Sequence, residues 1–305
     1  MKRNYQKELE QLLENLTEQK QVPALFLHSC CAPCSSYVLE YLSQYFSITV
    51  FYYNPNIYPD EEYYKRVEEQ KQFIKRFNEN NKNLSNHQQE PKEKIGQRTF
   101  HEISFVEGNY DKDRFYEMAK GLEQVPEGGK RCFACYELRL REAAEYAKEL
   151  GMDYFTTTLS ISPMKNAEKL NEIGEKLAQE YGIPYLTSDF KKKNGYKRST
   201  EISREYGMYR QDYCGCVFSL REREQQKQER ELQEYRVIQI VEPDFGCEGR
   251  PEGQKPIDMV YLENVRTKER IIIKVPDNIL YQEEIEEGTV ITEKVMQQIQ
   301  QIGQM

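Results

Sequence analysis

Residues 24–53 read ALFLHSCCAPCSSYVLEYLSQYFSITVFYY, and this stretch predicts the fold of the chain. The apolar run at 24–28 is typical of a buried strand, and the β-branched and aromatic residues of 47–53 are typical of a second one. Between them, apolar and aromatic residues recur at helical spacing over 36–45. Strand, helix and strand within about 30 residues form a βαβ unit, which implies a parallel sheet.

The same alternation continues along the chain. Further strands are predicted at 100–106, 154–159 and 184–187, and further helices at 61–78, 111–122, 135–151 and 167–181. We therefore expect a catalytic α/β domain over residues 1–235, with a Rossmann-like, nucleotide-hydrolase-like, doubly wound parallel sheet. Within it, residues 79–98 are polar and have no apolar period, so they predict a flexible insertion.

The character of the sequence changes after residue 235. Short strands are predicted at 236–241, 259–263, 269–275 and 288–292, followed by a helix at 293–302. Strands joined directly by turns are typical of antiparallel pairing. Residues 236–305 are therefore expected to form a small β-rich C-terminal domain.

The charge and hydropathy of the 305 residues exclude some protein classes. No apolar run approaches the ~18 residues of a membrane span. The polar, amphipathic first twenty residues do not resemble a signal peptide, so a cytoplasmic protein without a membrane partner is expected. The net charge of −8 argues against broad nucleic-acid binding. Residues 186–223 nevertheless carry nine Lys and Arg against five Asp and Glu, a pattern that by itself indicates a solvated helix face.

Seven of the eight cysteines fall into three groups. They are Cys30, Cys31 and Cys34 after the first strand, Cys132 and Cys135 in a C-x-x-C at a helix start, and Cys214 and Cys216 in a C-x-C. Clustered cysteines in a reducing compartment indicate metal ligands or redox groups. Ligands bind at the carboxyl ends of strands in such sheets, and a helix N-terminus favours the thiolate form. Cys247 is expected to be a free thiol, and His28 a packed residue at a strand end.

Three kinds of protein could carry these cysteines. Cys31 and Cys34 alone are typical of a dithiol oxidoreductase, and two cysteine clusters are typical of a zinc-stabilised RNA-binding protein without catalysis. Seven cysteines exceed the four that zinc uses, whereas a 4Fe–4S cluster takes about four and leaves three for a second, open-sided metal. A redox metal centre is therefore favoured. A nucleotide-dependent sulfur transferase would need a glycine-rich loop, but residues 29–36 contain no glycine.

Five motifs carry a resemblance to a known family. They are LHSCCAPCSS (27–36), FYYNPNIYPDEEY (51–63), RCFACYELRL (131–140), TTLSISPMKN (157–166) and YRQDYCGCVFS (209–219). In this order, over roughly 23–220, they resemble the cobalamin-independent epoxyqueuosine reductase family QueH, formerly DUF208. The resemblance implies reduction of epoxyqueuosine to queuosine at the tRNA wobble position. It also implies a 4Fe–4S cluster beside a mononuclear iron, with an unidentified electron donor. Where a relative has aspartate, this chain has Cys34, so the second metal would have an all-thiolate shell.

Particular residues are expected to carry these roles. The cluster is expected on Cys31, Cys132, Cys135 and Cys214, and the second, catalytic iron on Cys30, Cys34 and Cys216. Contacts to anticodon stem-loop phosphates are expected from Lys191, Lys192, Lys193, Lys197, Arg198, Arg204 and Arg210. A flipped base could stack on Tyr52, Tyr58 or Tyr209. Proton donor candidates are Tyr53, Asp189 and Tyr213.

Overall fold

The computed structural model describes residues 3–86, 100–242 and 256–302. It divides into two compact units, residues 1–220 and 221–305. The boundary expected after residue 235 stays a prediction. Cys247 and residues 87–98 of the expected insertion lie outside the described residues. Among the described helices, none has both the length and the apolar character needed to cross a bilayer.

The first unit is built on a parallel sheet. Its strands are β1 (Ala24–His28), β2 (Ser47–Tyr52), β3 (Ser104–Glu107) and β4 (Tyr154–Thr157), in the order β3-β2-β1-β4. The expected fifth strand is reduced to one parallel bridge between Tyr185 and Phe155. This arrangement confirms the predicted parallel α/β fold.

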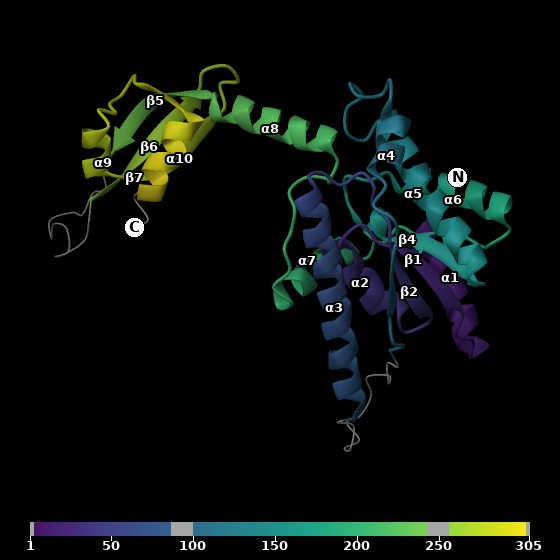
Figure 1. The fold of residues 1–305 in the computed structure, drawn as a ribbon. Coiled ribbons are helices and arrows are strands. Elements are labelled where there is room, and N and C mark those ends of the chain that lie inside the picture. Colours follow the sequence, from purple (N-terminus) through teal and green to yellow (C-terminus); the bar gives the residue numbers. More distant parts are fainter. Residues whose placement is uncertain (1–2, 87–99, 243–255, 303–305) are drawn as a thin grey trace. The chain divides into compact units, whose positions relative to one another are not determined.

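Helices cover both faces of this sheet (Figure 1). They are α1 (Tyr5–Glu18), α2 (Ala32–Leu42), α3 (Asp60–Asn86), α4 (Lys112–Ala119), α5 (Lys130–Glu149), α6 (Ala167–Tyr181) and α7 (Gly195–Glu205), with a 3-10 turn, η1 (Thr158–Ile161), after β4. Because side chains alternate along a strand, Leu25 and Leu27 of β1 pack in one core with α1, α2 and α3, whereas Phe26 packs in the other with α5 and α6. The sheet is therefore buried on both sides, as expected of a doubly wound fold.

Three helix boundaries differ most from the prediction. α2 begins at Ala32 rather than residue 36, because a proline such as Pro33 is tolerated in the first helical turn. α5 begins at Lys130 rather than residue 135. α3 continues to Asn86, so residues 79–86 of the expected flexible insertion are helical. The cysteine motifs therefore lie at the N-terminal ends of α2 and α5.

The strand order also explains where a site can form. The chain moves outward from β1 to β3 and then crosses back to β4, so the order reverses between β1 and β4. Ligands of open α/β sheets bind outside the carboxyl ends of the strands at such a switch point. The Cys30–Cys34 segment follows β1 and η1 follows β4, and both lie at this edge.

The second unit contains an antiparallel sheet, as the sequence predicts. α8 (Val217–Glu231) leads into it, and its other elements are β5 (Glu234–Val241), β6 (Ile257–Asn264), β7 (Arg270–Pro276), α9 (Asp277–Gln282), β8 (Val290–Thr292) and α10 (Glu293–Ile302). The strand order is β7-β6-β5-β8. One face of the sheet packs with α9 and α10 around Val237, Val260 and Ile299. This unit has its own apolar core.

Candidate metal centre

All three cysteine groups lie at helix N-termini. Cys31 is the N-cap residue of α2, Cys132 and Cys135 occupy the first two turns of α5, and Cys216 directly precedes α8. Backbone N–H groups contact the sulfur atoms: that of Gly128 donates to Cys132 Sγ at 3.2 Å, and that of Ser219 to Cys216 Sγ at 3.4 Å. The partial positive charge of a helix N-terminus stabilises thiolates, which are the form that binds metals.

Three thiols form what we call the β1 thiol group: Cys30, Cys31 and Cys34. Their sulfur atoms all lie within 4.8 Å of one another, close enough to hold one metal ion. Gln211 Nε2 donates a hydrogen bond to Cys31 Sγ at 3.0 Å. Hydrogen bonds from Cys30 and Cys34 hold the pKa of the Cys31 thiol well below its usual range. Three adjacent sulfur atoms are suited to bind a soft metal.

The other four cysteines form the helix thiol group: Cys132, Cys135, Cys214 and Cys216. Cys135 and Cys216 pack together beside Phe115. Cys214 interacts electrostatically with the other three thiols of the group. Burial raises the pKa of the Cys135 thiol to about 12. Four thiols within range of electrostatic interaction match the ligand number of a 4Fe–4S cluster.

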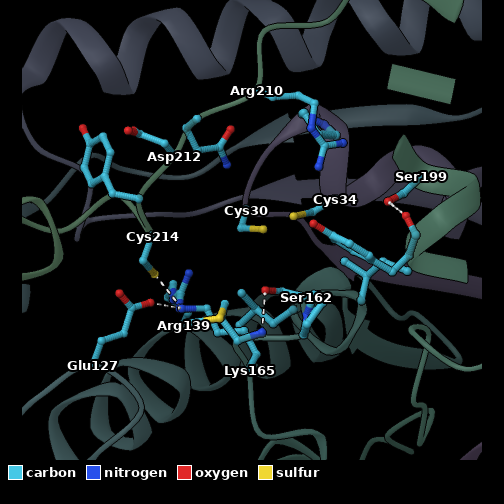
Figure 2. Close-up of a pocket in the computed structure, with 18 residues that line it drawn as sticks. Cys30, Cys34, Glu127, Arg139, Ser162, Lys165, Ser199, Arg210, Asp212 and Cys214 are labelled. Carbon is cyan, nitrogen blue, oxygen red and sulfur yellow. Dashed lines mark hydrogen bonds and ion pairs between the residues drawn. The ribbon is translucent and has the colours of Figure 1, made fainter. Parts of the chain in front are cut away.

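One cavity of about 360 Å³ connects the two groups. Cys30 and Cys34 line it from the β1 thiol group, and Cys214 lines it from the helix thiol group (Figure 2). The expected division of the cysteines differs from this grouping, since Cys31 lies with Cys30 and Cys34, and Cys216 lies with Cys135. Sequence spacing could not reveal which side of the cavity each thiol occupies.

Buried cations surround the thiols. The side chains of Arg66 and Arg139 are each 2 % exposed, and that of Lys165 is 8 % exposed. Arg139 donates from Nε to the Cys135 carbonyl at 3.2 Å, and its Nη2 has no hydrogen-bond partner among the described residues. Arg66 donates to the Cys214 carbonyl at 3.4 Å. Buried cations are costly unless negative charge compensates them, and thiolates at a metal supply that charge. The donor set therefore fits thiolate-bound metals.

Lys165 makes the most direct contact between a cation and a thiol. Its Nζ donates to Cys214 Sγ at 2.7 Å and lies 3.3 Å from Glu127 Oε1. Burial alone would lower the pKa of Lys165, but the Cys214 thiolate, Tyr136 and Glu127 outweigh it and raise this pKa well above the usual value. The ammonium is thus held charged inside the site.

His28 is a packed residue, as expected. Its Nδ1 lies 2.8 Å from Thr157 Oγ1 and its Nε2 lies 3.0 Å from the Tyr53 carbonyl oxygen. Because burial and the nearby Arg139 disfavour the charged ring, the pKa of His28 is lowered to about 3. Both ring nitrogens are engaged with the protein, so His28 joins β1 to its neighbours.

The basic residues predicted to contact tRNA fall into two classes. Some are held by carboxylates: Lys191 by Asp189 at 3.2 Å, Lys193 by Glu10 at 2.5 Å, and Arg198 by Glu40 at 2.6 Å. The others are exposed: Lys192, Lys197 and Arg204, together with Arg210 at the cavity. The exposed residues can contact a phosphate without first breaking an ion pair.

The residues predicted to stack on a base or to donate a proton lie in different environments. Tyr52 and Tyr53 are fully buried, and Lys65 lies 3.2 Å from the ring centroid of Tyr209. Tyr213 lines the cavity and donates to the Tyr58 carbonyl at 2.6 Å. Of these candidates for stacking or proton transfer, Tyr213 is the one that lines the cavity among the described residues.

Sequence reasoning missed several residues of the site. Arg139, Lys165 and Tyr196 line the cavity, and Gln211 both lines it and contacts Cys31. The first two lie in RCFACYELRL and TTLSISPMKN, and Gln211 lies beside the C-x-C. Their positions within these motifs could have indicated a role in the site. Charged side chains are usually exposed, however, so burial beside the thiols was not expected.

Comparisons with known proteins agree with one another. The family described as "Epoxyqueuosine reductase QueH" matches residues 25–222. A protein named Epoxyqueuosine reductase QueH from Staphylococcus epidermidis is 42 % identical over 218 residues, which is 71 % of this chain and 84 % of that protein. Proteins of the same name from Streptococcus pyogenes and Thermotoga maritima are 40 % and 33 % identical. Those alignments cover 71 % and 67 % of this chain and 78 % and 94 % of those proteins.

Proposed function

Because this chain belongs to the epoxyqueuosine reductase QueH family, we propose that it is the oxidoreductase that converts epoxyqueuosine to queuosine at the wobble position of tRNA. The observation that supports this most directly is the arrangement of two thiol groups around one cavity at the switch point of the sheet. The matched family region ends at residue 222, so the reaction is assigned to the first unit.

The reaction needs a redox centre. Two C–O bonds of the epoxide break, a carbon–carbon double bond forms, and the oxygen leaves as water, which takes up two electrons and two protons. The electrons come from a partner that we assign to the class of low-potential, one-electron donors. When bound, a 4Fe–4S cluster supplies single-electron transfer and an open iron supplies Lewis acidity.

We assign the two metals to the two thiol groups. The helix thiol group has the four sulfur ligands that a 4Fe–4S cluster uses. The β1 thiol group, with three sulfur atoms within 4.8 Å, would hold the mononuclear iron and leave a position open. We propose this division in place of the one expected in the sequence analysis, because Cys31 lies within 4.8 Å of Cys30 and Cys34, and Cys216 packs with Cys135.

The protein around the cavity would bind the modified nucleoside. Leu159, Ile161 and Pro163 give the lining an apolar part that excludes water. Tyr196 and Tyr213 offer ring faces of the kind on which flipped bases stack. Exposed Lys192, Lys197 and Arg204 would contact anticodon stem-loop phosphates. A substrate of this kind also supports a cytoplasmic location.

Anaerobic purification followed by metal analysis tests the proposal. We expect a coloured protein with about four sulfides and one iron more than sulfide per chain, and loss of the epoxide from epoxyqueuosine-containing tRNA when reductant is added. A colourless protein whose activity depends only on Cys31 and Cys34 would instead be a dithiol oxidoreductase. Zinc in place of iron, without visible absorption, would favour the RNA-binding alternative.

A further inference from the structure

A short turn places Lys165 at the helix thiol group. The Lys165 backbone N–H donates to the Ser162 carbonyl at 3.1 Å, and the N–H of Met164 donates to Ser162 Oγ at 3.3 Å. Pro163 occupies the second position of this turn, where proline is favoured because its φ is already fixed. Asn166 then caps α6. The backbone of Lys165 is therefore fixed between η1 and α6.

A second lysine, Lys191, donates a hydrogen bond to the same turn. Lys191 donates from Nζ to the Lys165 carbonyl at 3.2 Å and pairs with Asp189 at 3.2 Å. With the backbone held in this way, the Lys165 side chain runs into the protein, where its ammonium meets Cys214 and Glu127 (Figure 2). Lysines are almost never buried without a partner, and here the partners are the Cys214 sulfur atom and, at a longer distance, the Glu127 carboxylate.

The two thiol groups receive different donors. The Lys165 ammonium donates to Cys214 in the helix thiol group, whereas the neutral amide of Gln211 donates to Cys31 in the β1 thiol group. A hydrogen bond from a charged donor is roughly twice as strong as a neutral one, and burial strengthens it further. The side-chain hydrogen bond to the helix thiol group thus comes from a charged donor, and the one from Gln211 to the β1 thiol group comes from a neutral donor.

Reduction of a cluster adds one negative charge to it. A buried ammonium at a ligand sulfur stabilises the reduced form more than the oxidised form, and hydrogen bonds to the sulfurs are known determinants of cluster potentials. We propose that Lys165, through its hydrogen bond to Cys214 Sγ, raises the reduction potential of the cluster held by the helix thiol group. This proposal rests on the proposed function, since it requires a cluster at that group.

A redox titration of the purified protein tests the proposal without an activity assay. Wild type and Lys165→Met are titrated anaerobically with dithionite and mediators, and the reduced cluster is counted by electron paramagnetic resonance. At the wild-type midpoint, Lys165→Met should show at least a tenfold lower ratio of reduced to oxidised cluster, which is 59 mV for one electron. Iron and sulfide contents should match those of wild type.

Three further variants make the result specific. Lys165→Arg keeps a charged donor and should stay close to the wild-type potential, and Lys165→Gln, a neutral donor, should fall between wild type and Lys165→Met. Gln211→Met is the matched control, because it removes a hydrogen bond to the other thiol group and should leave the cluster potential unchanged. If Lys165→Met loses the cluster, the proposal is tested by comparing the cluster potentials of Lys165→Gln and Lys165→Arg. A lower potential in Lys165→Gln supports the role of Lys165, and equal potentials overturn it.

The outcomes separate this inference from the proposed function. Equal potentials for wild type, Lys165→Gln and Lys165→Met, with clusters intact, would overturn the role of Lys165 while leaving the reductase assignment in place. A shift in Gln211→Met but not in the Lys165 variants would overturn it as well. Wild-type protein that binds no iron or sulfide would refute the proposed metal centre itself.

Discussion

Gly215 lies so close to the guanidinium of Arg66 that an added side chain would press against it. A Cβ on Gly215 would stand 3.0 Å from Arg66 Nη1 and 3.2 Å from Ile57 Cγ1. Gly215 also has a φ of +122°, which side chains rarely allow. Its carbonyl accepts a hydrogen bond from the Tyr58 N–H at 2.8 Å. The glycine of the C-x-C motif thus lets the loop turn between two cysteines against a buried arginine.

The first prediction concerns this glycine. Gly215→Ala should destabilise the fold by about 1–3 kcal/mol through backbone strain and displace Arg66, so that the protein binds less iron. Urea unfolding and iron counting measure the two effects. Gly207→Ala is the matched control, because Gly207 has a φ of +64° with nothing within 4 Å of its added Cβ. Equal iron contents in the two variants would contradict the role of the close contact.

The second prediction tests the division of the metals. Cys216→Ser should remove most of the visible absorption and the sulfide, because it takes a ligand from the helix thiol group. Cys31→Ser should keep the sulfide content of wild type and lose about one iron per chain, because the β1 thiol group would hold a single ion. The iron and sulfide contents per chain are measured for both anaerobically purified variants. Loss of sulfide in Cys31→Ser alone would restore the division first expected from the sequence.

Local sequence signals predicted much of the fold. The strand at Ala24–His28 has the predicted ends because an apolar run stands between Pro23 and a polar Ser29. The end of α6 was also predicted, since Gly182 takes a left-handed conformation there, with a φ of +69°. By contrast, α7 was not predicted. Its sequence, GYKRSTEISRE, has few apolar residues and therefore no clear period.

The candidate sulfur ligands could be selected from the sequence, but their surroundings could not. Cysteine spacing selected seven thiols as candidate ligands, because soft ligands bind metals in groups, and their joint role stays a prediction. Burial of Arg139 and Lys165 follows from tertiary packing at the switch point, which no local pattern encodes. The same limit applies to Lys191. In the sequence it belongs to a basic run, whereas in the structure its ammonium pairs with Asp189.

The third prediction concerns Arg139. Its guanidinium interacts with Cys135, Cys214 and Cys30, so Arg139→Met removes a cation that compensates thiolates of both groups. Breaking a buried charge interaction costs about 3–5 kcal/mol, and we expect faster loss of visible absorption in the presence of an iron chelator. Arg141→Met, two residues along α5, removes solvent-accessible ion pairs with Glu137 and Glu180 that do not involve the thiols. That variant should behave as wild type, and equal bleaching rates would count against the proposed compensation.

The fourth prediction concerns the exposed basic residues. Lys197 and Arg204 lie two helical turns apart on α7, both exposed, and would contact successive phosphates of the anticodon stem-loop. Lys197→Ala and Arg204→Ala should each weaken tRNA binding and lower the salt slope of log K by about 1, since one phosphate contact is lost. Filter binding over a range of salt concentrations measures this. Lys193→Ala is the control. Because the Lys193 ammonium is already paired with Glu10, this variant should change the salt slope little. If instead Lys193→Ala lowers the slope and the α7 variants do not, the tRNA lies on the surface around Glu10 rather than on α7.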